Sequence, residues 1–127
     1  MGGPVRTVLF VSTRDSFLGQ GMKARFNKLA RNERLADQLI ARSAGLQEQN
    51  VVTEPMIIQN TYVLTMRPWQ KAEILERTRH ASGSTFTVRE FLEQPEDEEI
   101  IPFQELPRLT QMVYNKLKAE ITSLVSS

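Results

Sequence analysis

Residues 5–31 read VRTVLFV STRDSFLGQG MKARFNKLAR, and this stretch decides the fold class. Its first seven residues form an almost continuous β-branched and apolar run, which is typical of a strand covered on both faces in a parallel sheet. A polar, glycine-bearing turn follows at residues 12–21. The next segment carries apolar side chains at helical spacing: Met22, Phe26 and Leu29. Strand, loop and helix in this order indicate the opening of a parallel α/β fold.

The rest of the chain continues the alternation. Further strands are expected at residues 62–66 and 85–92, and further helices at 69–79 and 106–125. Residues 35–44 suit either a continued helix or a short second strand, which we place at 39–43. The last helix has one apolar stripe: Leu109, Val113, Leu117, Ile121 and Leu124. The polar residues 45–53 read as a turn. We therefore expect residues 1–127 to form one domain, with a doubly wound parallel sheet of about four strands and helices on both faces.

Composition excludes several kinds of site. The chain has no cysteine and a single histidine, His80, so a disulfide framework, a metal site rich in Cys or His and a cysteine nucleophile are excluded. We expect no metal and no cofactor. Lys and Arg are spread along the sequence and the net charge is +1, which predicts no nucleic-acid partner. No apolar run is long enough to span a bilayer and no signal segment opens the chain, so we expect no membrane partner and a cytoplasmic location.

The loop after the first strand is the place to look for function. In open α/β sheets, ligands bind at the carboxyl ends of the strands. A loop that leads into a helix also offers backbone N–H groups and the positive end of the helix dipole, which together hold anions. The candidate loop comprises Ser12, Thr13, Arg14, Asp15, Ser16, Phe17, Leu18 and Gly19. Its serines and threonine equally suit a tight turn and a helix cap.

The stretch VLFVSTRDSFLGQGMKARFNKLA at residues 8–30 resembles the opening of the low-molecular-weight protein tyrosine phosphatases, within the arsenate reductase-like superfamily. That family has an apolar strand, then Cys-Thr-Gly-Asn-x-x-Arg-Ser-Pro, then a helix that begins Met-Ala-Glu. Residues 42–45 (RSAG) are similar to the family's Ser-Ala-Gly segment, residues 62–66 (YVLTM) to its strand ending in Met-Asp, and residues 88–99 to its approach to the Asp-Pro loop. The resemblance covers most of the chain and implies the phosphatase fold.

The resemblance also implies that the catalytic residues are lost. Ser12 stands where the family has its nucleophilic cysteine, and Leu18 where it has the arginine that clamps phosphate. Arg14 and Asp15 replace the loop's glycine and asparagine, and Asp15 would repel an incoming phosphate. Ile101 precedes Pro102 where the family has its general acid, and an isoleucine cannot donate a proton.

Two further features of the family bear on the substrate and partner surfaces. The segment at 45–53 is too short for the family's helix and long loop between the second and third strands, which implies a reduced substrate-side wall. The sequence allows two placements of the Trp69 side chain, on a binding face or buried against the sheet.

These residues support three hypotheses about function. The leading one is a catalytically inactive or strongly impaired phosphatase-like protein that acts as a binding or regulatory module and holds an inorganic anion weakly at most. The second is residual phosphatase or arsenate-type phosphoryl chemistry, with Ser12 as nucleophile and Arg14 as clamp. The third is a flavodoxin-like binder of a phosphate-bearing ligand.

A protein partner or a second copy of the chain is expected at the former active-site face. We expect the apolar side chains of Phe17, Leu18, Ile101 and Phe103 either to form an exposed docking patch there or to pack inward.

Overall fold

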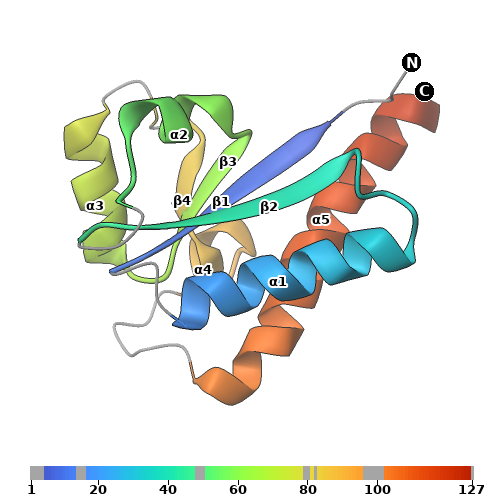
Figure 1. Cartoon of the computed structure of the whole chain (residues 1–127), viewed down its shortest axis with the longest axis horizontal. Coiled ribbons are helices and arrows are strands. Elements are labelled where there is room, and N and C mark those ends of the chain that lie inside the picture. The colour runs from blue at the N-terminus through green and yellow to red at the C-terminus, as the bar shows by residue number, and fades with distance from the viewer. Residues whose placement is uncertain are drawn as a thin grey trace.

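The computed structural model describes residues 5–13, 17–47, 51–78, 81, 83–95 and 102–126. The elements follow in the order β1 (Arg6–Ser12), α1 (Phe17–Asn32), β2 (Leu39–Gly45), α2 (Glu54–Gln59), β3 (Tyr62–Thr65), α3 (Pro68–Arg77), β4 (Thr85–Thr87), α4 (Val88–Phe91), a 3₁₀ helix (Phe103–Glu105) and α5 (Leu106–Ser126). The strands form one sheet in the order β2-β1-β3-β4, and every neighbouring pair is parallel. Figure 1 shows β1 in the middle of this sheet. The predicted α/β class and four-stranded parallel sheet are confirmed.

Side chains of β1 alternate between the two faces of the sheet, and each face is covered by its own helices. Val8 and Phe10 belong to a large buried cluster with residues of α1, α4 and α5. Leu9 and Val11 belong to a smaller cluster with Ile57 of α2 and Ile74 of α3. Figure 1 shows the same division, with α1 and α5 on one side of the sheet and α2 and α3 on the other. The uninterrupted apolar run of β1 is therefore explained by burial on both faces.

The edge strand β2 is covered by a side chain of α1. The amide of Asn27 donates from Nδ2 to the carbonyl of Ala41 at 3.0 Å, and its Oδ1 accepts from the Ala41 amide at 2.9 Å. Backbone groups on the free edge of a sheet otherwise lack partners within the protein. This pair of hydrogen bonds fixes α1 against β2, and with it the start of the helix that follows the candidate loop.

Three sequence-based expectations need correction. The first helix begins at Phe17 rather than Met22, so it takes in the second half of the candidate loop. Only residues 85–87 of the expected strand 85–92 are extended, because the Thr87 hydroxyl accepts from the Glu90 amide and starts α4. Finally, the connection between β2 and β3 does contain a helix, the six-residue α2. Thr53 caps α2, and Pro55 lies in its first turn, where a missing N–H costs nothing.

Of the helices in the described ranges, none combines the length and apolar character needed to cross a bilayer.

Candidate functional site

The carboxyl ends of the four parallel strands meet at one edge of the sheet, and the candidate loop leaves the sheet there. Ser12 is the last residue of β1 and is only 2% exposed. A Cβ atom placed on Gly19, in the first turns of α1, would lie 3.1 Å from the Ser12 Oγ. The Ser12 hydroxyl therefore packs closely against the start of α1, and glycine at position 19 leaves the room for it.

Thr13 ties the loop to the segment after β2. Its carbonyl oxygen accepts from the amides of Leu46 and Gln47, at 2.9 and 2.8 Å. The Leu46 amide also donates to the Ser12 carbonyl, at 3.0 Å. On the opposite side, the Thr13 hydroxyl oxygen accepts from Gln70 Nε2 at 3.0 Å. Thr13 is thus held by the segment after β2 on one side and by a side chain of α3 on the other.

Gln70 was not identified from the sequence, although its side chain joins three groups at this edge. It is 2% exposed, and its Oε1 accepts from the amides of Met66 and Arg67, each at 3.0 Å. The remaining bond is the one to Thr13. One signal was available: Gln70 stands three residues after Arg67, the residue that caps α3, with Pro68 between them. A Gln at that position often reaches back to the cap.

Leu18 occupies the position at which the sequence resemblance places a phosphate-clamping arginine. Its side chain is half-buried and packs against the large apolar cluster that includes Val8 and Phe10. Of the two outcomes expected for this residue, the inward packing is the one observed. Arg14, Asp15 and Ser16 lie outside the described residues, as does the side chain of Phe17.

Of the remaining predicted site residues, the structure describes Pro102. Pro102 is exposed, just before the 3₁₀ helix. Ile101, the side chain of Phe103 and His80 lie outside the described residues. Trp69, at the start of α3, is 44% exposed, so it is not buried against the sheet.

Shifted pKa values occur away from the loop. Burial and a hydrogen bond to Glu120 raise the pKa of Tyr62 to about 12. Burial and a hydrogen bond to Glu33 likewise raise the pKa of Tyr114. Hydrogen bonds from Tyr114 and Lys118 lower the pKa of Glu33. All these groups lie on β3, α5 and the turn after α1, so they join elements together and are not placed to act on a ligand of the candidate loop.

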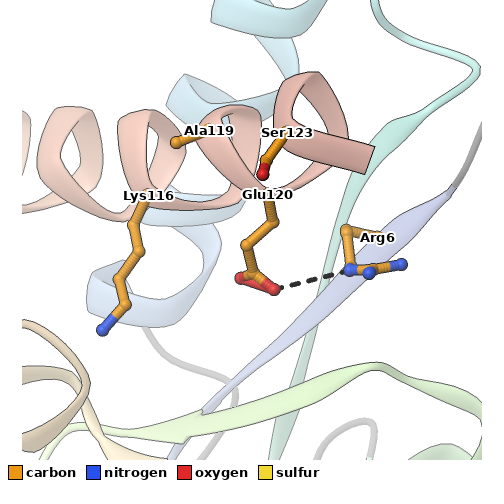
Figure 2. A pocket seen from close by; sticks show the side chains of 5 residues that line it. All are labelled: Arg6, Lys116, Ala119, Glu120 and Ser123. Carbon is orange, nitrogen blue, oxygen red and sulfur yellow. Dashed lines mark ion pairs between the residues drawn. The ribbon is translucent and has the colours of Figure 1, made fainter. Parts of the chain in front are cut away.

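A hollow of about 490 Å³ lies at the opposite end of β1. Arg6, Lys116, Ala119, Glu120 and Ser123 line it. Figure 2 shows the Glu120 carboxylate pointing from α5 toward Arg6, and these two groups form an ion pair at 3.5 Å. Because Arg6 begins β1 and Ser12 ends it, this hollow is separate from the candidate loop. Within the described ranges, no three His, Asp or Glu side chains are grouped so that they could hold a metal ion.

Comparison by sequence finds no matching family model and no matching curated protein. Comparison of structures finds close matches of similar length. YfkJ from Bacillus subtilis is 16% identical with a TM-score of 0.78, over 97% of this chain and 98% of that one. A low molecular weight protein tyrosine phosphatase from Bacillus subtilis is 20% identical with a TM-score of 0.76, over 89% and 97% of the two chains. The YwlE arginine phosphatase from Geobacillus stearothermophilus is 22% identical with a TM-score of 0.75, over 91% and 94%.

At these identities the matches concern the fold, and they cover most of both chains in each case. This chain has the fold of the low-molecular-weight protein tyrosine phosphatases.

Proposed function

We propose that this chain is a catalytically inactive or strongly impaired phosphatase-fold protein that acts as a binding or regulatory module. The packing of the half-buried Leu18 side chain against the large apolar cluster carries the proposal, because the clamp of a phosphoryl-transfer site has to be a cation that faces the phosphate. The chain also has no cysteine, so a thiolate nucleophile is absent from the whole sequence.

Ser12 is a poor substitute for a thiolate. A serine hydroxyl stays protonated at neutral pH unless a base activates it. The described part of the loop, Thr13 and residues 17–19, carries no acidic or basic side chain. The described residues of the loop therefore supply neither a base for the Ser12 hydroxyl nor a cation for the transition-state charge, whose stabilisation is commonly worth about 3–4 kcal/mol per group.

The test is hydrolysis of p-nitrophenyl phosphate at neutral pH. We expect no turnover above the rate in buffer, for the wild type and for Ser12→Ala alike. Ser84→Ala is a matched control, since it makes the same change in a turn before β4. Turnover that survives Ser84→Ala and disappears in Ser12→Ala would overturn the proposal.

One similar structure favours the second function, phosphoryl transfer to Ser12. It is a YwlE arginine phosphatase mutant with a phosphorylated active-site serine, so a serine in this fold can carry a phosphoryl group. In this reaction the Ser12 oxygen would bond to phosphorus, the phenolate would leave, and the hydroxyl proton would pass to solvent. Intact-protein mass spectrometry after incubation with p-nitrophenyl phosphate decides between the two. We expect no mass increase, and a phosphoryl adduct at Ser12 would establish the second function.

Weak anion binding is part of the proposal. The start of α1 still has backbone N–H groups, which can bind an anion. The arginine that clamps phosphate in the family is replaced by Leu18. We expect an affinity for inorganic phosphate no better than about 1 mM, or roughly −4 kcal/mol. Titration followed by amide NMR shifts of Thr13 and residues 18–20 measures it. Saturation at micromolar phosphate would show a functional anion site.

The binding role points to the former active-site edge as a protein contact. Trp69 and Pro68 are exposed there, and Trp is enriched at the centres of protein interfaces. We expect the double change Phe17→Ser and Phe103→Ser to reduce self-association or partner binding, measured as molar mass by light scattering.

A flavodoxin-like role predicts a bound flavin instead, which the absorbance spectrum of the purified protein would reveal.

A further inference from the structure

The outer side of α1 carries an unusual concentration of positive charge. Within its 16 residues the helix has four cations and no Asp or Glu, and Arg34 follows in the next turn. All five side chains are exposed: Lys23, Arg25, Lys28, Arg31 and Arg34. We refer to these five residues as the basic face of α1. In Figure 1, α1 lies on the same side of the sheet as α5, with its full length at the surface.

The other described cations have partners. Ion pairs to Glu are made by Arg6, Lys71, Arg77, Arg89, Arg108 and Lys118. Arg42 donates to the Asn60 side chain, and Lys116 donates to the Phe91 carbonyl while lying over its ring. Arg67 also has a partner. Among the described residues, the side chains of the basic face form no comparable hydrogen bond or ion pair.

This arrangement costs the free chain some stability. Arg25, Lys28 and Arg31 follow one another on α1 at three-residue spacing, and like charges three or four residues apart on a helix destabilise it by about 0.2–0.5 kcal/mol per pair. The opposite side of α1 is fully used by the core, where Met22, Phe26 and Ala30 are buried. The basic face is therefore not needed to hold α1 in place, and an external anionic surface is its natural complement.

The composition of the face identifies the kind of anionic surface. The described side chains of α1 include no exposed large apolar residue, which an interfacial membrane helix needs. The chain carries net +1 and α1 alone contributes +4, so the rest of the chain is net −3. A nucleic acid carries its charge over a long distance, so the net negative charge of the rest of the chain would repel it. A protein side chain in contact with the basic face interacts mainly with the charges next to it.

We propose that the basic face of α1 docks an acidic helix of a protein partner. From Lys23 to Arg31 the face extends about 12 Å along the axis of α1, at 1.5 Å per residue, and Arg34 follows in the turn beyond the end of the helix. A partner helix with Glu at three- and four-residue spacing repeats its carboxylates on the same scale, and the guanidinium groups of Arg25, Arg31 and Arg34 can hold them bidentately. This surface is distinct from the loop at Ser12, so it stands whether or not the chain turns over phosphate.

The test uses two labelled helical peptides of identical composition. One carries its Glu residues on a single helix face at three- and four-residue spacing, and the other has the same residues distributed around the helix. Fluorescence anisotropy at low salt should show tighter binding of the first peptide. The double change Lys28→Glu and Arg31→Glu should weaken it by at least about tenfold. The matched control, Arg77→Glu with Arg108→Glu, makes the same change in net charge elsewhere and should leave the affinity within about twofold.

Three results would overturn the proposal. Equal binding of the two peptides would reduce the face to unspecific charge attraction. In the second, random-sequence duplex DNA, or vesicles containing phosphatidylserine, bind more tightly than the first peptide and lose that binding in Lys28→Glu/Arg31→Glu. This result would assign the face to phosphate backbones or to lipid. An equal loss in both double variants would show that overall charge decides the affinity. Circular dichroism of each variant separates these results from misfolding.

Discussion

Gln70 joins two loops and one helix start at the carboxyl edge of the sheet. Replacing it with leucine leaves the amides of Met66 and Arg67 and the hydroxyl of Thr13 without its amide. Since each polar group buried without a partner costs about 1–3 kcal/mol, we expect Gln70→Leu to lower the free energy of unfolding by about 2–4 kcal/mol, measured by urea denaturation. Gln111→Leu is the control, because that side chain bonds only to Asn115 on the exposed side of α5. An equal effect of the two changes would contradict the role given to Gln70.

Two glycines of α1 form a second matched pair at the residue scale. A Cβ atom at Gly21 meets nothing within 4 Å, whereas one at Gly19 meets the Ser12 Oγ at 3.1 Å. We expect Gly21→Ala to raise the free energy of unfolding by about 0.5–1 kcal/mol, since alanine favours the helix. Gly19→Ala should give less than this or destabilise, because the Ser12 hydroxyl has to move. Thermal denaturation compares them, and equal gains would mean that Ser12 does not pack on the helix as described.

At the scale of single elements, the tyrosines fix α5 to the rest of the fold. Tyr62 of β3 donates to Glu120, and Tyr114 of α5 donates to Glu33 after α1. Burial disfavours the charged phenolate and both hydrogen bonds need the neutral phenol, so folding raises both pKa values above their ordinary value of 10, that of Tyr62 to about 12. The stabilisation is therefore complete below pH 10 and is lost as the pH rises through about 12.

The prediction is that neither tyrosine ionises near pH 10 while the protein stays folded. The chain has two tyrosines, so the ultraviolet absorbance of phenolate reports on these two groups alone. We expect the phenolate signal to appear together with loss of the far-ultraviolet helix signal at high pH. Tyr62→Phe should halve the signal without an earlier step. A full phenolate step near pH 10 with the helix signal unchanged would contradict the two hydrogen bonds.

The elements that the sequence predicted well are those with long, consistent patterns. Four residues of the stripe predicted for α5 are confirmed as buried, Leu109, Val113, Leu117 and Ile121, because they repeat on successive turns of the helix. The side chain of Leu124 lies outside the described residues. Helix α2 was missed because six residues are too few to show a period, and only Ile57 of them is buried. Residues 88–91 were taken for strand because Val and Phe favour strands, whereas the Thr87 cap decides for a helix.

The position of the candidate loop could be predicted from the sequence, but the contacts of its residues could not. Ser12 and the loop after it follow from the strand–loop–helix order alone. The bond from Gln70 to Thr13 spans 57 positions of the sequence, and no local pattern indicates such a pairing. The inward packing of Leu18 was left as one of two outcomes because it depends on how α1 meets the large cluster, which requires tertiary structure.

For the whole molecule, the two sides of the sheet differ in the size of their cores. Among the described residues, seventeen buried side chains form the cluster under α1, α4 and α5, and nine form the cluster under α2 and α3. Local opening costs less free energy where fewer apolar contacts are broken. Helix α2 is also short and leaves Ile58 63% exposed, so it should open most easily.

Native-state hydrogen exchange tests this difference. We expect the slowest amides in β1 and β3, the two strands with a neighbour on each side, and in α5. Amides of α2 should exchange with a markedly smaller opening free energy, and those of α3 should lie between. Ile57→Ala, in the smaller cluster, should speed exchange in α2 and α3 while α1 and α5 keep their protection relative to global unfolding. Leu117→Ala, in the larger cluster, should lower protection everywhere, because removing it weakens the part of the fold that opens last. If α2 proves as protected as α5, the sheet and both helical layers unfold as one cooperative unit, and the smaller cluster is no weaker than the larger one.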